Sequence, residues 1–159
     1  MRKVILCLFI LTILTSSAAL ANQIKPDYGI DGVIYLGNTK DQVIASWGQP
    51  TMSIPAEVFL GVLGKNCEGY FYTKYSIGLI FDKDGRIIYI ATSSTKHATV
   101  EGIKVGDGLN AVLNTYGSDY YKEKTIDPKY DYRIRYEKLG YEFRFKNDKV
   151  TDIGVFYKK

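Results

Sequence analysis

The sequence predicts an α+β fold made of two tandem repeats, each a short helix followed by an antiparallel β-meander, with the helices packed on one face of the sheet or sheets. Two observations support this prediction. The segment 37–48 aligns without a gap on 106–117, and both segments end with an aromatic residue before a closing glycine. Each segment is then followed by alternating apolar and polar residues, the pattern of half-buried strands. We therefore expect repeat 1 over residues 22–95 and repeat 2 over residues 96–159.

Each repeat is expected to contain a helix of two turns. Thr39 and Gln42 have the spacing of a capping box, which places the start of the first helix at Thr39. Gly48 can adopt the left-handed conformation that ends a helix, and Pro50 prevents continuation. In repeat 2, apolar residues recur at helical spacing over 109–116, again before a glycine. Helices this short are unstable alone, so their apolar faces must pack on a sheet.

Three strands are expected after each helix, and a fourth is compatible with the pattern. They cover residues 69–75, 78–82 and 86–93 in repeat 1, and residues 130–137, 140–146 and 150–157 in repeat 2. The alternation predicts one buried face and one solvated, charged face. It leaves open whether the two sheets are continuous. The apolar stretch 54–63 is interpreted as a short helix or strand covering the sheet, or as an exposed docking patch.

Residues 1–21 have the features of a cleaved secretory signal peptide. A basic start at positions 2–3 precedes an apolar stretch at 4–14, and Ala19 and Ala21 fit the small-x-small rule for cleavage. The apolar stretch has about 11 residues, whereas a membrane-spanning helix needs about 20. We therefore expect a soluble protein, exported to the periplasm or the cell exterior, with no integral membrane segment after cleavage.

The two cysteines carry different expectations. Cys7 lies inside the apolar stretch of the signal peptide, too early to be the lipidated first residue of a mature chain, so we expect no lipid anchor. Cys67 is the cysteine that remains after cleavage. It is either buried or available for an intermolecular disulfide, and burial is favoured because a free cysteine packs as a small hydrophobic residue.

The helix segments follow the pattern Gly-x-[Thr/Gly]-x-x-x-Val-x-x-x-[Trp/Tyr]-Gly. This pattern, between a strand and an aromatic-rich meander, resembles the SmpA/OmlA (BamE) type of small outer-membrane assembly lipoprotein. The segment 48–50, Gly-Gln-Pro, is similar to that family's Gly-x-Pro after the helix. Two such units in tandem also resemble the β-lactamase inhibitor protein (BLIP). The resemblance covers nearly all of residues 30–157 and implies a protein without enzymatic activity.

Two departures accompany the resemblance. The lipidated cysteine of the assembly lipoproteins is absent, which weakens the inference of membrane anchoring and of a direct assembly role. The second copy has Gly-Ser-Asp at 117–119 where the first has Gly-Gln-Pro.

Residue types that carry out catalysis or bind metals are sparse. His97 is the only histidine, and we expect it on the surface of the connection 94–101, because no nucleophile motif accompanies it. One histidine and one cysteine do not make a zinc site of the usual ligand count. The segment 82–85, Asp-Lys-Asp-Gly, lacks the remaining ligands of a calcium loop and predicts a hairpin turn. We therefore expect no enzymatic activity, no cofactor and no metal.

Tyrosine and arginine are enriched at protein interfaces, and the chain has 14 tyrosines. The predicted partner-binding residues are Tyr70, Tyr72, Tyr120, Tyr121, Arg133, Arg135 and Arg144. In the alternative interpretation the tyrosines fill the core and the arginines solvate the outer face of the sheet. Glu137 and Glu142 are expected to form cross-strand ion pairs with the neighbouring arginines rather than to act as an acid–base pair.

The formal net charge of +4 falls to +2 without Arg2 and Lys3, which gives no electrostatic basis for binding nucleic acid. The leading hypothesis is a secreted or periplasmic, non-enzymatic protein-binding or scaffold module of the bacterial cell envelope, whose partner is another envelope protein. The alternative is a small-ligand-binding or weakly hydrolytic envelope protein with a pocket between the two repeats, near His97.

Overall fold

The computed structural model describes residues 22–26, 28–55 and 67–158 of the 159-residue chain. The main element is one antiparallel sheet of eight strands, and the described ranges contain only two helices of eight residues each. The fold is therefore mostly β. The prediction of an α+β fold with two tandem helix-plus-meander repeats is wrong, because strands from both halves of the chain pair into a single sheet. The predicted boundary between residues 95 and 96 stays a prediction.

The large sheet has the strand order β3-β4-β5-β6-β10-β9-β8-β7. Its strands are β3 (Met52–Pro55), β4 (Glu68–Tyr72), β5 (Ile77–Phe81), β6 (Ile87–Thr92), β7 (Tyr121–Lys124), β8 (Tyr132–Tyr136), β9 (Tyr141–Lys146) and β10 (Lys149–Phe156). A separate two-stranded sheet consists of β1 (Ile24–Lys25) and β2 (Gly29–Ile30). Helix α1 (Lys40–Trp47) precedes β3, and helix α2 (Leu109–Tyr116) precedes β7. The strands expected from the sequence correspond to β4, β5, β6, β8, β9 and β10.

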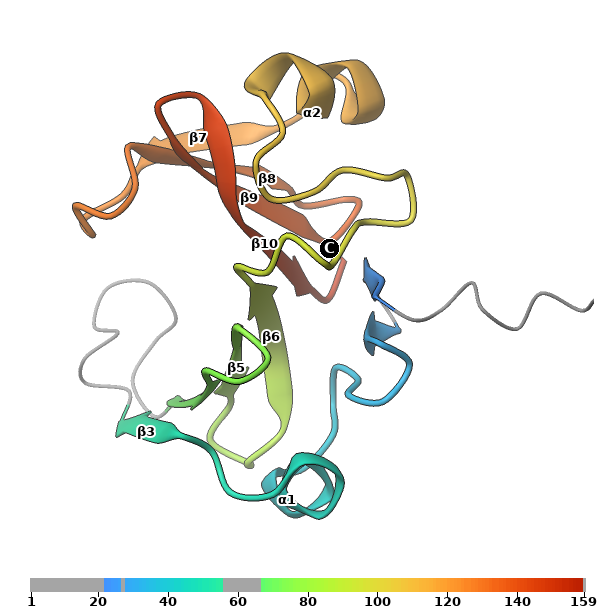
Figure 1. Ribbon diagram of the computed structural model, residues 1–159, viewed down its shortest axis with the longest axis vertical. Helices are drawn as coiled ribbons and strands as arrows, with labels where there is room; N and C mark the ends of the chain where they lie inside the picture. Colours follow the sequence, from blue (N-terminus) through green and yellow to red (C-terminus); the bar gives the residue numbers. More distant parts are fainter. Residues whose placement is uncertain (1–21, 27, 56–66, 159) are drawn as a thin grey trace, which may run out of the picture.

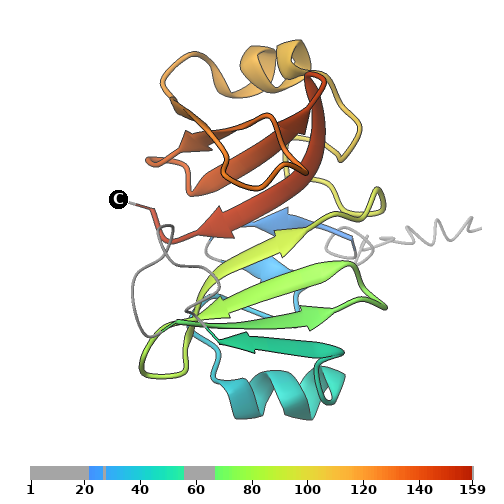
Figure 2. The same cartoon turned by 90° about the vertical axis from the view of Figure 1, so that its left-hand side faces the viewer.

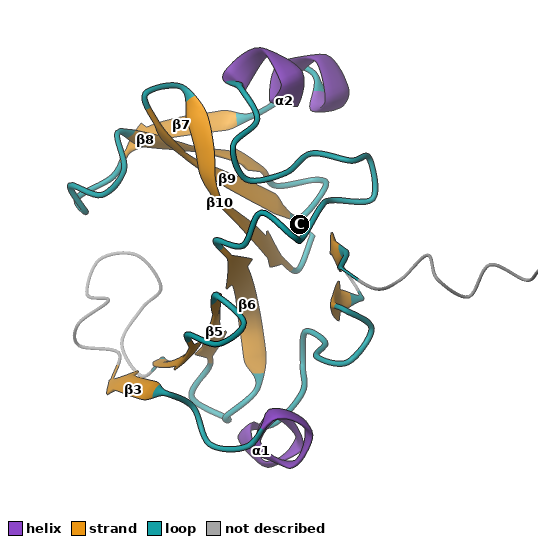
Figure 3. Ribbon diagram, in the orientation of Figure 1, coloured by secondary structure: helices purple, strands orange, loops and turns teal. Residues whose placement is uncertain are grey.

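Both helices lie on the same side of the large sheet (Figures 1 and 3). The sheet curves from β3 at one end, through β6 and β10 in the middle, to β7 at the other end (Figure 1). Figure 2 shows the strands stacked between α1 and α2, with β1 and β2 beside the middle of the stack. We call the side that packs against the helices the helix face of the sheet, and the opposite side the open face.

The main hydrophobic core lies between the helix face and the two helices. Val43 of α1 and Val112 of α2 are fully buried in the same cluster as Phe81 and Phe143 of the sheet. The alternation of side chains along β9 explains how this strand contributes to the core. Phe143 and the residues two positions before and after it point to the core, whereas Glu142 points to the open face.

The start of α1 follows the predicted capping chemistry, whereas its end has a positive φ at Gly48 but a ψ of −168°, outside the predicted left-handed helical conformation. Thr39 caps α1, and the side chain of Gln42 accepts a hydrogen bond from the backbone N–H of Thr39, which completes the capping box. Gly48 ends the helix with a φ of 79°, and its N–H donates to the carbonyl of Ile44 at 2.8 Å. Gly117 ends α2 in the same way, with a φ of 80°.

The pairing of β6 with β10 joins the halves of the sheet. Ile153 pairs with Thr92 and Gly154 with Ala91 in antiparallel register. The sequence leaves open whether the two predicted sheets are continuous, and this pairing shows that they are. The fold is therefore a single layered structure rather than two separate units.

The remaining sequence predictions concern the apolar stretch 54–63, the signal peptide and the two cysteines. Residues 54–55 belong to β3, whereas 56–63 lie outside the described residues, as do the predicted signal peptide at 1–21 and Cys7. Cys67 is buried beside Ile80, in agreement with the favoured interpretation. No helix within the described ranges is long and apolar enough to span a membrane.

Candidate binding surface

Three arginines surround one buried glutamate on the open face. The side chain of Glu142 is 3% exposed. Its Oε1 lies 2.9 Å from Nε of Arg144, and its Oε2 lies 3.5 Å from both Nη1 of Arg133 and Nε of Arg135. The register of β8 and β9 sets these residues side by side, since Arg135 faces Glu142 and Arg133 faces Arg144. A buried carboxylate is costly unless it is paired, and the three guanidinium groups provide that pairing.

Tyr89 of β6 reaches this cluster from the other half of the sheet. Its hydroxyl donates to Oε1 of Glu142 at 2.9 Å and accepts from Nη2 of Arg144 at 3.3 Å. To do so, the tyrosine ring crosses over Gly154 of β10. A Cβ at Gly154 would lie 2.1 Å from the Tyr89 hydroxyl, so only glycine fits there. Burial raises the pKa of Tyr89 well above its usual value of 10, against the opposing effect of the Arg144 guanidinium. The hydroxyl therefore stays protonated and donates.

Further contacts fix the arginines in place. Arg133 also forms an ion pair with Glu123 of β7. The guanidinium of Arg135 lies 4.5 Å from the ring centre of Phe156, and that of Arg144 lies 5.2 Å from the ring centre of Tyr130. The three arginine side chains are only 12%, 23% and 25% exposed, in sequence order. We call these three arginines, Glu142 and Tyr89 the arginine cluster; its side chains are held by several contacts each, and it keeps an excess of positive charge.

A second buried carboxyl lies next to the arginine cluster. Asp152 of β10 faces Arg144 across the ladder, and its side chain is 10% exposed. Its Oδ1 accepts a hydrogen bond from the Tyr130 hydroxyl at 3.2 Å and lies 3.7 Å from Nζ of Lys129. Burial raises the pKa of Asp152, and the positive charges of Lys129 and Arg144 oppose this effect without cancelling it.

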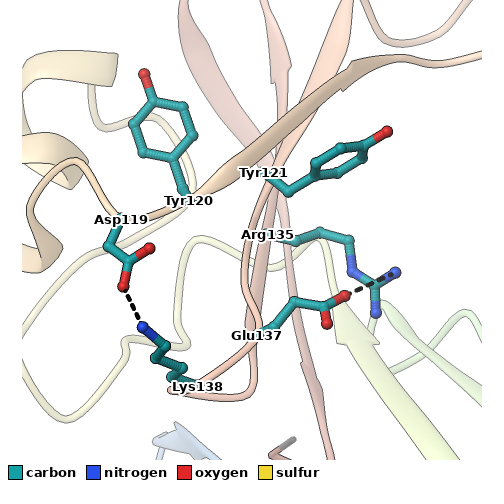
Figure 4. Close-up of a pocket in the computed structure, with 6 residues that line it drawn as sticks. All are labelled: Asp119, Tyr120, Tyr121, Arg135, Glu137 and Lys138. Carbon is teal, nitrogen blue, oxygen red and sulfur yellow. Dashed lines mark hydrogen bonds and ion pairs between the residues drawn. The ribbon is translucent and has the colours of Figure 1, made fainter.

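A shallow depression opens beside the arginine cluster, at the β7 end of the sheet (Figure 4). Its lining residues are Asp119, Tyr120, Tyr121, Arg135, Glu137 and Lys138. Two ion pairs stabilise its rim, since Lys138 lies 2.8 Å from Asp119 and Arg135 lies 3.9 Å from Glu137. The Tyr121 side chain stands at this rim and is one of the most exposed large hydrophobic side chains among the described residues, at 59%. Arg135 belongs to both the arginine cluster and the depression, so the two form one continuous surface.

The structure separates the seven predicted binding residues into three groups. On the open face it brings together Tyr121, Arg133, Arg135 and Arg144. Tyr120 lines the depression and packs edge-to-face on Tyr136, with ring centres 5.8 Å apart.

The other two predicted residues, Tyr70 and Tyr72, lie on the helix face. Tyr70 packs against Phe81, and Tyr72, which is 3% exposed, donates a hydrogen bond to the carbonyl of Gly48 at 3.0 Å. These two tyrosines fill the core, as the alternative interpretation of the sequence predicts.

Sequence reasoning missed two residues of the arginine cluster and its surroundings, Tyr89 and Asp152. Tyr89 lies in an almost wholly apolar strand, where the sequence does not separate a core tyrosine from one that carries a hydrogen bond. The available signal was Gly154, because a glycine inside a strand often marks a close approach of another chain segment or side chain.

The prediction of a surface-exposed His97 is wrong, because the structure buries it to 5% exposure. Its Nδ1 lies 2.6 Å from the Thr92 hydroxyl oxygen, and its Nε2 lies 3.2 Å from Oδ2 of Asp31. Asp31 in turn accepts a hydrogen bond from the backbone N–H of Asn22 at 2.9 Å. The turn after β6 folds the histidine inward, and this chain of contacts joins the N-terminal segment to the large sheet.

The threonine–histidine–aspartate series is not arranged as a nucleophilic site. Thr92 is 1% exposed, and its hydroxyl oxygen already accepts the backbone N–H of Ser94 at 3.1 Å. A nucleophile needs an approach path for its substrate. The residues that line the depression of Figure 4 do not include His97. Among residues 22–26, 28–55 and 67–158, no group of three or more histidine, cysteine, aspartate or glutamate residues could hold a metal ion.

Comparison with known proteins adds information about the fold. No family model and no curated protein sequence matches the chain. The uncharacterized protein yfeY from Escherichia coli matches in structure with a TM-score of 0.56 and 11% identity, over 86% of this chain and 98% of that chain. A cysteine-rich secretory protein from Staphylococcus aureus matches with a TM-score of 0.51 and 14% identity, over 86% of this chain and 47% of that one.

A third match is an extracellular protein containing a SCP domain from Bacillus anthracis, with a TM-score of 0.46 and 9% identity, over 77% of this chain and 44% of that one. The chain spans less than half of the length of this protein and of the staphylococcal protein. At these identities the likeness concerns the fold alone.

The matches overturn the predicted resemblance to the SmpA/OmlA (BamE) lipoproteins and to the β-lactamase inhibitor protein. The matched structures share a mostly-sheet fold and include neither kind of protein. The residues that carried the resemblance have a local explanation. Thr39 caps α1 and Gly48 ends it at positive φ, and both are general requirements of a short capped helix rather than of one family.

Proposed function

We propose that this chain is an exported, non-enzymatic protein-binding module that contacts its partner through the arginine cluster and the depression beside it. The observation that supports this function best is the continuity of the two at Arg135, with Tyr121 exposed at the rim. Tyrosine and arginine dominate the binding energy of many interfaces. The partner is expected to be another protein of the cell envelope.

The rigidity of the arginine cluster favours binding over catalysis. Each arginine is held by Glu142 and by at least one further contact, to Glu123, Phe156 or Tyr130. Side chains that are already ordered lose little conformational freedom when a partner binds, so more of the contact energy contributes to affinity. The depression is shallow and lies at the edge of the sheet, which suits a protein surface better than an enclosed small molecule.

Export is supported by the N-terminal sequence and by one structural match. Residues 1–21 combine a basic start, a short apolar stretch and an Ala-x-Ala cleavage site. The staphylococcal protein of similar fold is a secretory protein. Determination of the mature N-terminus by mass spectrometry of the natively expressed protein should give Asn22. An intact Met1 in a cytoplasmic fraction would contradict export.

Site-specific photo-crosslinking tests the binding surface. A photoreactive amino acid replaces Tyr121, and in a matched control it replaces Tyr28, which is 54% exposed and belongs to the N-terminal segment. In native envelopes we expect a discrete crosslinked protein from position 121 and none of the same mass from position 28. The same products from both positions, or none from position 121, would contradict the proposed surface.

A substitution then tests the affinity. Tyr121→Ala should weaken binding of the crosslinked partner at least about tenfold, because truncation of a tyrosine that is a binding hot spot costs about 2 kcal/mol or more. Its thermal unfolding temperature should change by no more than about 2 °C, since the side chain is exposed.

A further inference from the structure

Strand β7 forms one end of the large sheet in the described part of the chain, and β3 forms the other. Half of the backbone N–H and C=O groups of a terminal strand point away from the sheet and can pair with another strand. The two ends differ in composition. Pro55 lies in β3 and removes a hydrogen-bond donor, whereas the four residues of β7 include no proline. The β7 edge is therefore the better template for an added strand.

Exposed apolar side chains lie at both ends of β7. Among the described residues, Ile126 and Tyr121 are the two most exposed large hydrophobic side chains, at 89% and 59%. Tyr121 is the first residue of β7, and Ile126 follows its last residue by two positions. A strand added along β7 would cover part of both side chains, which is favourable because apolar area is removed from water.

The charges of β7 determine which kind of strand fits. Lys122 and Lys124 pair with Ile134 and Tyr132 in the ladder, so both lysines stand on the helix face. Both are exposed. Glu123, on the open face, is already paired with Arg133. The uncompensated charges along this edge are therefore two positive charges, two residues apart, on one side of the strand.

These charges disfavour pairing with a second copy of this chain. In an antiparallel pairing centred on Lys122, that lysine would face its own copy. In a pairing centred on Glu123, Lys122 would face Lys124 of the other copy. Like charges directly opposite each other destabilise a strand pair, and edge lysines are a known protection against self-association.

We propose that β7 pairs with an extended segment of a partner protein that carries acidic residues at alternate positions. The acidic side chains would lie beside Lys122 and Lys124, and the intervening apolar side chains would contact Tyr121 on the open face. Backbone hydrogen bonds to the strand supply affinity, and the alternating side chains supply specificity. This inference deepens the proposed function, since it rests on binding at the same end of the sheet and names the form of the bound segment.

Synthetic peptides test this pairing directly. The probe is a fluorescently labelled eight-residue peptide of alternating valine and glutamate, measured by fluorescence anisotropy with the full mature chain. One control peptide has alternating valine and lysine, and another has the probe sequence with alternate backbone amides methylated. We expect the probe to bind at least about tenfold more tightly than either control. In hydrogen exchange, the amides of residues 121–124 that point away from β8 should exchange at least about tenfold more slowly with the probe bound.

Charge reversal of the edge identifies the site. Lys122→Glu with Lys124→Glu should weaken binding of the glutamate probe at least about tenfold and improve binding of the lysine peptide. The matched control, Lys74→Glu with Lys96→Glu, changes the net charge equally at exposed positions elsewhere and should leave probe binding unchanged. Because Lys122 also lies 3.7 Å from the ring centre of Tyr132, Lys124→Glu alone serves as a second variant that keeps this contact.

The outcomes separate this inference from the proposed function. Equal binding of all three peptides, no change on charge reversal, or unchanged exchange at 121–124 would overturn the pairing at β7. If crosslinking from position 121 still yields a discrete partner in that case, the partner contacts the open face without adding a strand. If the glutamate probe binds as expected while position 121 yields no partner, the β7 edge accepts acidic strands but the proposed function is wrong.

Discussion

Tyr89 on β6 donates a hydrogen bond of 2.9 Å to Glu142 on β9, and it reaches across β10 to do so. This contact spans the boundary at which β6 and β10 join the two halves of the sheet. It therefore couples the arginine cluster of one half to the strand framework of the other. The contact depends on Gly154, which leaves room for the tyrosine ring.

Gly154→Ala should lower the free energy of unfolding by about 2–4 kcal/mol, because a methyl group would overlap the Tyr89 ring in a packed interior. Urea unfolding measures the change. The double variant Tyr89→Ala with Gly154→Ala should lose less than the sum of the two single losses, since the smaller side chain removes the overlap. Additive losses would show that the ring does not need the space at Gly154.

Glu142→Gln should lower the free energy of unfolding by about 3–5 kcal/mol, because three partly buried guanidinium groups would lose their shared carboxylate. Lys138→Ala is the control from the same end of the sheet. Lys138 and its partner Asp119 are each 80% exposed, so this substitution should leave the free energy of unfolding essentially unchanged. Equal effects of the two substitutions in urea unfolding would contradict a structural role for the Glu142 pairing.

Simultaneous removal of Arg133 and Arg144 is for the same reason a poor test of binding. Both arginines pair with Glu142, so the double alanine variant should lower the unfolding temperature and would not separate binding from folding. Tyr121 is the residue of this surface whose substitution should change binding alone.

Asp152→Asn should increase stability at neutral pH by about 1 kcal/mol, because a buried carboxylate is replaced by a neutral group of the same shape. The pKa of Asp152 is raised above 3.8 in the folded protein. Folding therefore favours its protonated form, so the associated stability is present below pH 3.8 and is lost as the pH rises through the folded-state pKa. The advantage of Asp152→Asn should accordingly shrink towards zero when unfolding is measured near pH 3. An advantage independent of pH would contradict this account.

Cys67 should react slowly with a thiol reagent in the native protein and rapidly in 6–8 M urea. It is buried beside Ile80, and burial raises the pKa of its thiol, with a further contribution from the charge of Asp82. Both effects lower the concentration of accessible thiolate. We expect a difference in rate of at least about a hundredfold at pH 8, followed by absorbance. Similar native and denatured rates would show that the thiol is exposed.

The helices and most strands could be predicted because their signals are local. The capping box of Thr39 and Gln42, the glycine at position 48 and the alternation in β8 and β9 each involve residues a few positions apart. The resemblance to a lipoprotein family was wrong for a related reason. It rested on these same local features, which many unrelated helices share.

The candidate site was predictable only in part. Alternation places Arg133, Arg135 and Arg144 on one face, together with Glu142, and the structure brings all four into contact. The same rule does not tell which face of β4 meets the helices, so the sequence predicts Tyr70 and Tyr72 at a binding surface, whereas both lie on the core side. The burial of His97 is not predictable from the sequence, because its partners Thr92 and Asp31 lie in different segments that only folding brings together.

The sequence by itself determined the positions of α1, α2 and the six strands expected from it, because short-range capping and periodicity encode them. Only the tertiary structure decided that β6 pairs with β10, that Tyr89 crosses Gly154 to reach Glu142, and that β7 ends the sheet with its lysines exposed. These features depend on long-range strand pairing, whose register is set by burial of one whole face of the sheet rather than by any local pattern.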